Sequence, residues 1–133
     1  MQTYKTVLEP TEEILYKDKG SKFYGYTFPI KTAKEFNHIL ETVKQKHSSA
    51  GHFCFAYQLG IETHYYRASD DGEPSNSAGL PIYGQIQAFG ITNALIVVVR
   101  YFGGTKLGVG GLISAYRTTA KLSLEASTIK TLD

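Results

Sequence analysis

A glycine-rich run between an apolar stretch and a predicted helix is the part of this 133-residue sequence best suited to bind a ligand. It lies within LIVVVRYFGGTKLGVGGLISAYRTTA, residues 95–120, and its glycines are Gly103, Gly104, Gly108, Gly110 and Gly111. A glycine turn leading into a helix presents backbone N–H groups and the positive end of the helix dipole, which together attract anions. Arg100, Lys106 and Arg117 are candidate charge partners. No capping side chain stands directly before Leu112, so the first N–H groups of the helix are expected to remain available.

Two interpretations of these glycines are open. Under the first, the run binds an anion. Under the second, the glycines only permit tight turns and close packing, and Gly110→Ala would lower stability without changing any binding. The spacing matches neither G-x-x-x-x-G-K-[ST] nor a convincing G-x-G-x-x-G dinucleotide fingerprint. The sequence therefore predicts no nucleotide cofactor, and we expect no other cofactor.

An acidic turn is the second candidate site, made of Asp70, Asp71, Gly72, Glu73 and Pro74. Three carboxylates within four residues suit acid–base work, a divalent cation or an exposed binding loop. The alternative is a structural turn in which the aspartates accept hydrogen bonds from local backbone N–H groups. The turn lacks the alternating oxygen ligands of a calcium loop, so we predict no metal site.

Cysteine and histidine carry weaker signals. Cys54 alternates with aromatic neighbours and fits a small core residue better than a nucleophile. His52 and His64 lack the H-E-x-x-H spacing of a zinc site, and no G-x-S-x-G motif occurs. No catalytic triad is recognisable, and catalytic residues stay unassigned.

Composition limits the classes of function. The hydrophobic fraction of 42% is typical of a folded domain, and the length suffices for one core. A formal net charge of only +2 argues against DNA binding and restricts any RNA contact to a local patch. A single cysteine excludes an internal disulfide. The sequence has neither a secretory leader nor an apolar run of about 20 residues, so we expect a cytoplasmic protein without membrane contact.

Hydrophobic periodicity and turn residues predict the order β-β-β-α-β-β-α-β-α. The expected strands are 4–8, 13–17, 22–30, 53–59, 62–69 and 94–102, and the expected helices are 33–47, 78–89 and 111–126. Thr32 and Glu35 fit a capping box, and Ser77 is the expected cap of the second helix. The first three strands suggest a meander. The pattern indicates an α+β fold, with a mixed sheet of four to six strands and helices on one face.

Three stretches of the sequence resemble the IMPACT family. They are AGHFCFAY at 50–57, DDGEPSNSAGLPI at 70–82 and VVVRYFGGTKLGVGGLISAY at 97–116. The resemblance implies a fold like the second domain of ribosomal protein S5, a two-layer α+β sandwich. It also implies a translational setting, because eukaryotic members are implicated in restraining the amino-acid-starvation kinase by competing for its ribosome-associated activator. Most bacterial members look longer, with a second, ferredoxin-like domain, so we expect residues 1–133 to form a single domain without that second one.

Three hypotheses of function follow. The first is a non-catalytic, translation-linked domain whose glycine-rich run, arginines and lysine contact RNA, the ribosome or an acidic surface of a translation-control protein. The second is an enzyme acting on a phosphorylated small molecule, which requires the acidic turn and the glycine-rich run to face one cleft. The third is a structural module for protein interaction.

Overall fold

The computed structural model describes residues 2–133, and it confirms the α+β class. Within these residues the strands are β1 (Tyr4–Val7), β2 (Ile14–Asp18), β3 (Ser21–Pro29), β4 (His52–Leu59), β5 (Tyr65–Ser69), β6 (Ala94–Tyr101) and β7 (Ile129–Leu132). The helices are α1 (Ala33–Lys46), α2 (Gly79–Phe89) and α3 (Gly108–Glu125). The predicted order of the first nine elements is confirmed. The short strand β7 was not predicted, because its four residues carry too little pattern to distinguish a strand from a loop.

The main sheet has the strand order β2-β3-β6-β4-β5, and every neighbouring pair is antiparallel. The expectation of a mixed sheet was therefore wrong. Helix α1 does connect two parallel strands, β3 and β4, but β6 is inserted between them and runs antiparallel to both. Strand β6 is buried along almost its whole length, because its apolar residues follow one another without alternation.

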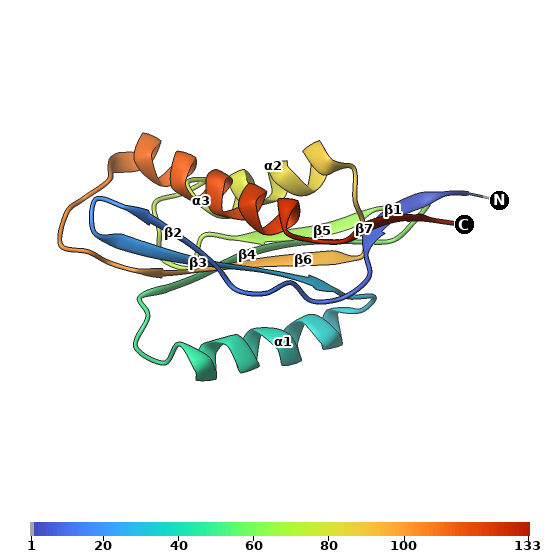
Figure 1. Ribbon diagram of the computed structural model, residues 1–133, viewed down its shortest axis with the longest axis horizontal. Coiled ribbons are helices and arrows are strands. Elements are labelled where there is room, and N and C mark those ends of the chain that lie inside the picture. The colour runs from blue at the N-terminus through green and yellow to red at the C-terminus, as the bar shows by residue number, and fades with distance from the viewer. Residues whose placement is uncertain (1) are drawn as a thin grey trace.

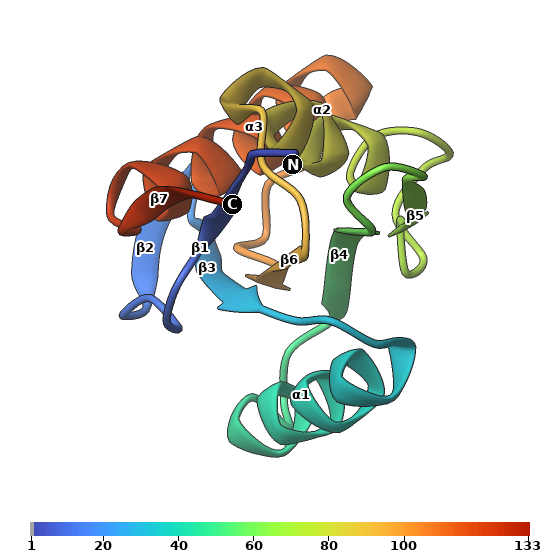
Figure 2. The ribbon, with the colours of Figure 1, turned by 90° about the vertical axis from the view of Figure 1, so that its right-hand side faces the viewer.

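Helices cover both faces of this sheet rather than one. Figure 1 shows α2 and α3 above the sheet and α1 below it, and Figure 2 shows α1 alone on its side. The reason lies in β6, whose alternate side chains are apolar in both directions. Ile96 and Val98 pack in the core under α2 and α3, whereas Val97 and Val99 pack in the core over α1. A sheet that is apolar on both faces needs a helix on each.

The first strand does not belong to the meander that the sequence suggested. β2 and β3 form a hairpin, but β1 pairs instead with β7 in a separate two-stranded sheet. This pairing joins the two ends of the described chain, which lie side by side in Figure 1. Such a contact cannot be read from local periodicity.

The capping box of α1 is confirmed. The Thr32 hydroxyl accepts a hydrogen bond from the Glu35 N–H at 3.1 Å, and the Glu35 carboxylate accepts one from the Lys31 N–H at 2.9 Å. Phe36 and Val43 of α1 pack against the face of the sheet. No helix among residues 2–133 is long and apolar enough to cross a membrane.

A buried polar network joins the C-terminal end of α1 to the sheet. The two ring nitrogens of His47 form hydrogen bonds with the hydroxyl groups of Tyr26 and Tyr101, the latter at 2.7 Å. Tyr26 also donates to the Glu13 carboxylate at 2.9 Å. Burial lowers the pKa of the His47 imidazole below its ordinary value of 6.5, the positive charge of Lys46 lowers it further, and Glu13 opposes the shift.

The stability of the fold should therefore fall on mild acidification. Since the folded state disfavours the imidazolium, the unfolded chain binds the proton first, and unfolding becomes easier as the pH drops below about 6.5. The contribution of neutral His47 is complete above about pH 7. Urea unfolding at several pH values between about 5 and 8 measures this slope. His47→Gln should flatten the slope, whereas His64→Gln, at an exposed position, should preserve it. Equal slopes in wild type and His47→Gln would contradict the assignment.

Candidate functional site

Three turns meet at one end of the molecule, at the left of Figure 1. They are the β2–β3 turn, the start of the acidic loop (residues 70–78) between β5 and α2, and the glycine loop (residues 102–107) between β6 and α3. The predicted candidate residues therefore come largely from segments that the fold brings together. What each of them contacts decides which are available to a ligand.

A buried ion pair between Glu73 and Arg100 connects the acidic loop to the central strand. The Nη1 atom of Arg100 lies 3.0 Å and 2.8 Å from the two carboxylate oxygens of Glu73. Only 3% and 6% of the two side chains are exposed. The Nε and Nη2 atoms of Arg100 donate to the Ser21 hydroxyl, which also accepts from the Gly103 N–H. Arg100 thus holds the acidic loop, the β2–β3 turn and the glycine loop together.

Further polar groups surround this pair. Tyr116 of α3 donates its hydroxyl hydrogen to Glu73, and the His52 imidazole lies 3.6 Å from the same carboxylate. Burial raises the pKa of the Tyr116 hydroxyl far above its usual range, and Glu73 and Cys54 raise it further, so the hydroxyl stays a donor. Burial likewise raises the pKa of the Cys54 thiol, with nearby carboxylates adding to the shift, so the thiolate needed for nucleophilic chemistry is disfavoured.

Asp70 caps helix α2. One carboxylate oxygen accepts hydrogen bonds from the Ala78 and Gly79 N–H groups at 3.1 Å and 2.8 Å, and the other accepts from the Asn76 N–H at 2.8 Å. The prediction that Ser77 caps this helix was wrong. The Ser77 hydroxyl donates to the carbonyl of Pro74 instead. Both side chains are capping types, and only the fold of the loop places Asp70 over the helix end.

Asp71 fixes the same loop to β4. Its carboxylate accepts a hydrogen bond from the Phe53 N–H at 2.7 Å, and its carbonyl oxygen bonds to His52 Nδ1 at 2.8 Å. Asp71 and Gly72 both have positive φ angles, 39° and 86°, so the chain turns sharply here. All three carboxylates of the acidic loop therefore have partners within the chain.

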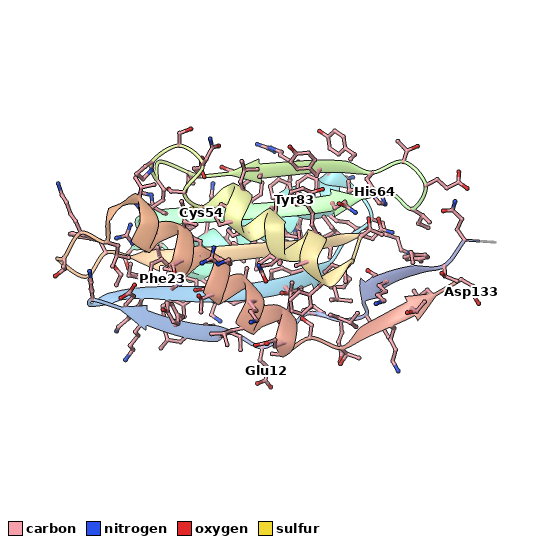
Figure 3. All side chains as sticks on the ribbon, turned by 90° about the horizontal axis from the view of Figure 1, so that it is seen from above. Glu12, Phe23, Cys54, His64, Tyr83 and Asp133 are labelled. Carbon is pink, nitrogen blue, oxygen red and sulfur yellow. The ribbon has the colours of Figure 1, made fainter. Side chains whose placement is uncertain are left out.

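The acidic loop and the glycine loop do not share the hollow beside Asp70. That hollow, of about 320 Å³, is lined by residues of β5, the acidic loop and the first turn of α2. Among residues 2–133, no group of three or more His, Cys, Asp or Glu side chains is placed to hold a metal ion. His64 is exposed, and Figure 3 shows it toward the opposite end of the molecule from Cys54 and Phe23.

Close contacts or backbone conformation within the fold explain most of the glycines near the start of α3. A Cβ atom at Gly103 would lie 1.9 Å from a backbone carbon of Gly20, so glycine is required by the contact between two turns. Gly104 and Gly108 have φ angles of +88° and +73°, which disfavour other residues. A Cβ atom at Gly111 would lie 3.1 Å from the Leu107 Cβ atom. Four of the five glycines are thus explained by the chain itself.

Gly110 is the exception. It is exposed within the first turn of α3, its φ angle is not positive, and a Cβ atom there would meet nothing within 4 Å. Helix α3 begins at Gly108 rather than Gly111, and its N-terminal cap, Leu107, makes no side-chain capping bond. The helix was expected to lack a side-chain cap, and the start at Gly108 lacks one as well. Lys106 stands exposed just before it.

The predicted cations are not all neighbours. Arg100 is buried against Glu73, and exposed Arg117 lies nine residues into α3, about 13 Å along the helix from Gly108. The β2–β3 hairpin contacts the glycine loop through Gly20 and Gly103, and it carries three exposed lysines, Lys17, Lys19 and Lys22. Sequence reasoning missed them, although YKDKGSKF, three lysines around a turn, is a visible basic signal.

Comparison of the sequence with protein-family models identifies the family of this chain. The Impact N-terminal domain model matches residues 19–124, which contain the Glu73–Arg100 pair and the glycine loop. The chain belongs to the IMPACT family. The predicted resemblance is thereby confirmed.

Individual relatives agree with the family assignment. The chain is 39% identical over 116 residues to the IMPACT family member YvyE of Bacillus subtilis, covering 87% of this chain and 53% of YvyE. A crystal structure of a hypothetical protein superposes with a TM-score of 0.93 at 30% identity, covering 99% of this chain and 65% of that one. The two-domain translational regulator Yih1 has a TM-score of 0.56 at 22% identity, covering 89% of this chain and 46% of Yih1, and shares the fold. The chain spans about half the length of the bacterial relatives that it matches.

Proposed function

We propose that this chain is a non-catalytic binding domain in the control of translation, and that the N-terminal end of α3 contacts RNA phosphate on the ribosome. Membership of the IMPACT family supports the translational setting, since Yih1, which has the same fold, is described as a translational regulator. The carboxylates that an enzyme would need are engaged in holding the acidic loop, so the binding hypothesis is preferred.

The observation that carries the phosphate contact is Gly110. Glycine in a helix costs stability relative to alanine, and nothing inside the chain requires it at this position. We attribute it to a partner outside the chain that approaches the backbone closely. A phosphate group is such a partner, because it can accept hydrogen bonds from the free N–H groups of the first helical turn. Exposed Lys106 adds a positive charge at the same end.

Ribosome binding tests this proposal. Co-sedimentation of the full chain with purified bacterial ribosomes at increasing KCl should show affinity that falls steeply with salt. Gly110→Ala should weaken binding about tenfold without loss of stability, and Lys106→Ala should weaken it and reduce the salt slope by about 0.7–0.9. Lys44→Ala, on the exposed side of α1, is the control for a lost charge.

Two outcomes would contradict the proposal. If the wild-type chain fails to sediment with ribosomes at low salt, the RNA contact is wrong. If Gly110→Ala and Lys106→Ala both bind like wild type, the start of α3 is not the contact. Capture of an acidic protein partner that Lys106→Ala abolishes, without any ribosome binding, would reassign this end of α3 to a protein surface.

A further inference from the structure

We infer that the exposed end of the β2–β3–β6 face, on the α1 side of the sheet, is a second contact surface that binds single-stranded RNA. The inference rests on the proposed function and extends it to a different surface. The surface is made of five side chains, here called the hairpin platform: Leu15, Lys17, Lys22, Tyr24 and Tyr101. In Figure 1 the β2–β3 hairpin extends to the left beyond the end of α1.

Strand register places these five side chains on one face. Leu15 pairs with Tyr24, and Lys17 pairs with Lys22, which in turn pairs with Tyr101. Side chains of directly paired residues point to the same side of a sheet, and so do residues two apart along a strand. Tyr24 packs against Tyr101 and against the His47 ring, with ring centroids 5.6 Å and 5.0 Å apart. The platform therefore lies on the face that α1 covers farther along.

The lysine pair has no explanation within the fold. Lys17 and Lys22 stand directly opposite each other across two strands, and like charges in that position are destabilising. Among residues 2–133, neither ammonium group forms an ion pair. Asp18, the nearest acid in sequence, pairs with Ser21 on the other face, and Glu13 is bound to Lys46. A bound polyanion would relieve the repulsion that the free protein retains.

The side chains of Leu15 and Tyr24, next to the lysine pair, suit contact with unpaired bases. Leu15 is 45% exposed, although it lies on a sheet face beside the partly exposed ring of Tyr24. Single-stranded RNA combines phosphates, which lysines attract, with base faces that stack on aromatic and apolar side chains. A duplex hides its base faces, so it would use the lysines alone. Charge and apolar surface in adjacent rows thus favour a single strand over a duplex or an acidic peptide.

Fluorescence anisotropy with a labelled 12-nucleotide oligouridine and the full chain tests the inference. The double variant Lys17→Gln with Lys22→Gln should weaken binding at least about tenfold and lower the salt slope by about 1.4, since each single-strand phosphate contact contributes about 0.7. Lys34→Gln with Lys44→Gln makes the same charge change on exposed positions of α1 and should leave affinity within about twofold. Tyr24→Leu should also weaken binding, whereas Tyr66→Leu, at the opposite edge strand, should not.

Urea unfolding distinguishes lost binding from lost folding. The lysine double variant should be at least as stable as wild type once the like-charge pair is gone. Loss of binding by a stable variant supports the inference. Four results would overturn it: oligouridine binding unchanged in the lysine double variant, equal loss in the α1 control, tighter binding of a 12-base-pair RNA duplex, or displacement by polyglutamate as effective as by unlabelled oligouridine. Oligouridine binding that depends on the platform while ribosome binding ignores Gly110 and Lys106 would overturn the proposed contact at α3 and leave this surface standing.

Discussion

Replacing Arg100 with leucine should lower the free energy of unfolding by about 3–5 kcal/mol, because it leaves the Glu73 carboxylate buried without its cation. The substitution also removes the donors to Ser21, so the β2–β3 turn loses a link to β6. Tyr116 still donates to Glu73, so the carboxylate retains one hydrogen-bond partner, but it has lost the cation that balances its charge. Chemical denaturation of wild type and variant measures the difference.

A double-mutant cycle separates the ion pair from simple loss of volume. Glu73→Leu alone should be similarly costly, whereas Arg100→Leu combined with Glu73→Leu should recover part of the lost stability, since no uncompensated charge remains. Arg117→Leu, an exposed change of the same type, should alter stability by no more than about 0.5 kcal/mol. Strict additivity of the two single variants would mean that the pair does not hold the three turns together.

The alanine variant at Gly103 should lose about 3 kcal/mol, at the upper end of the usual cost of overpacking. The new methyl group would lie 1.9 Å and 2.2 Å from backbone atoms of Gly20, and a backbone cannot move aside by changing a rotamer. The two turns must separate, which also strains the bond between the Gly103 N–H and the Ser21 hydroxyl. Thermal and urea unfolding both report this loss.

Gly110→Ala is the matched control for this prediction, seven residues away along the chain. With nothing within 4 Å of its Cβ atom, alanine there should be neutral or stabilise the helix by up to about 0.5 kcal/mol. Comparable destabilisation at both positions would contradict the assigned contacts. Such a result would also restore the hypothesis that all five glycines serve only the fold.

Local sequence pattern accounts for most of the secondary structure. The α1 capping box, the helix α2 and the strand β6 were all predicted, because each depends on residues three or four positions apart or on an uninterrupted apolar run. The start of α3 was placed three residues late. The prediction began the helix after its glycines, yet glycine is tolerated in a first turn when packing farther along holds the helix.

Pairings between distant segments could not be predicted. The Ser21–Arg100 contact joins residues 79 positions apart, and the Glu73–Tyr116 contact joins residues 43 apart. Nothing in the acidic turn distinguishes Glu73, which turns into the core, from Asp70, which caps α2. The same applies to the placement of α1 on the second face, because periodicity reports how apolar a face is and not which helix covers it.

The features of the candidate site also fall into those set by local sequence and those set by contacts between distant segments. The glycine-rich run, its family and its open helix start are properties of the sequence alone, because they depend on adjacent residue types. Tertiary structure decided which residues a ligand can reach. It buried Arg100 with Glu73, moved Arg117 away along α3, and brought the β2–β3 hairpin, which carries exposed lysines, beside the glycine loop through the contact of Gly20 with Gly103. Charge availability depends on burial and on partners, and both are set by contacts between segments that the sequence keeps far apart.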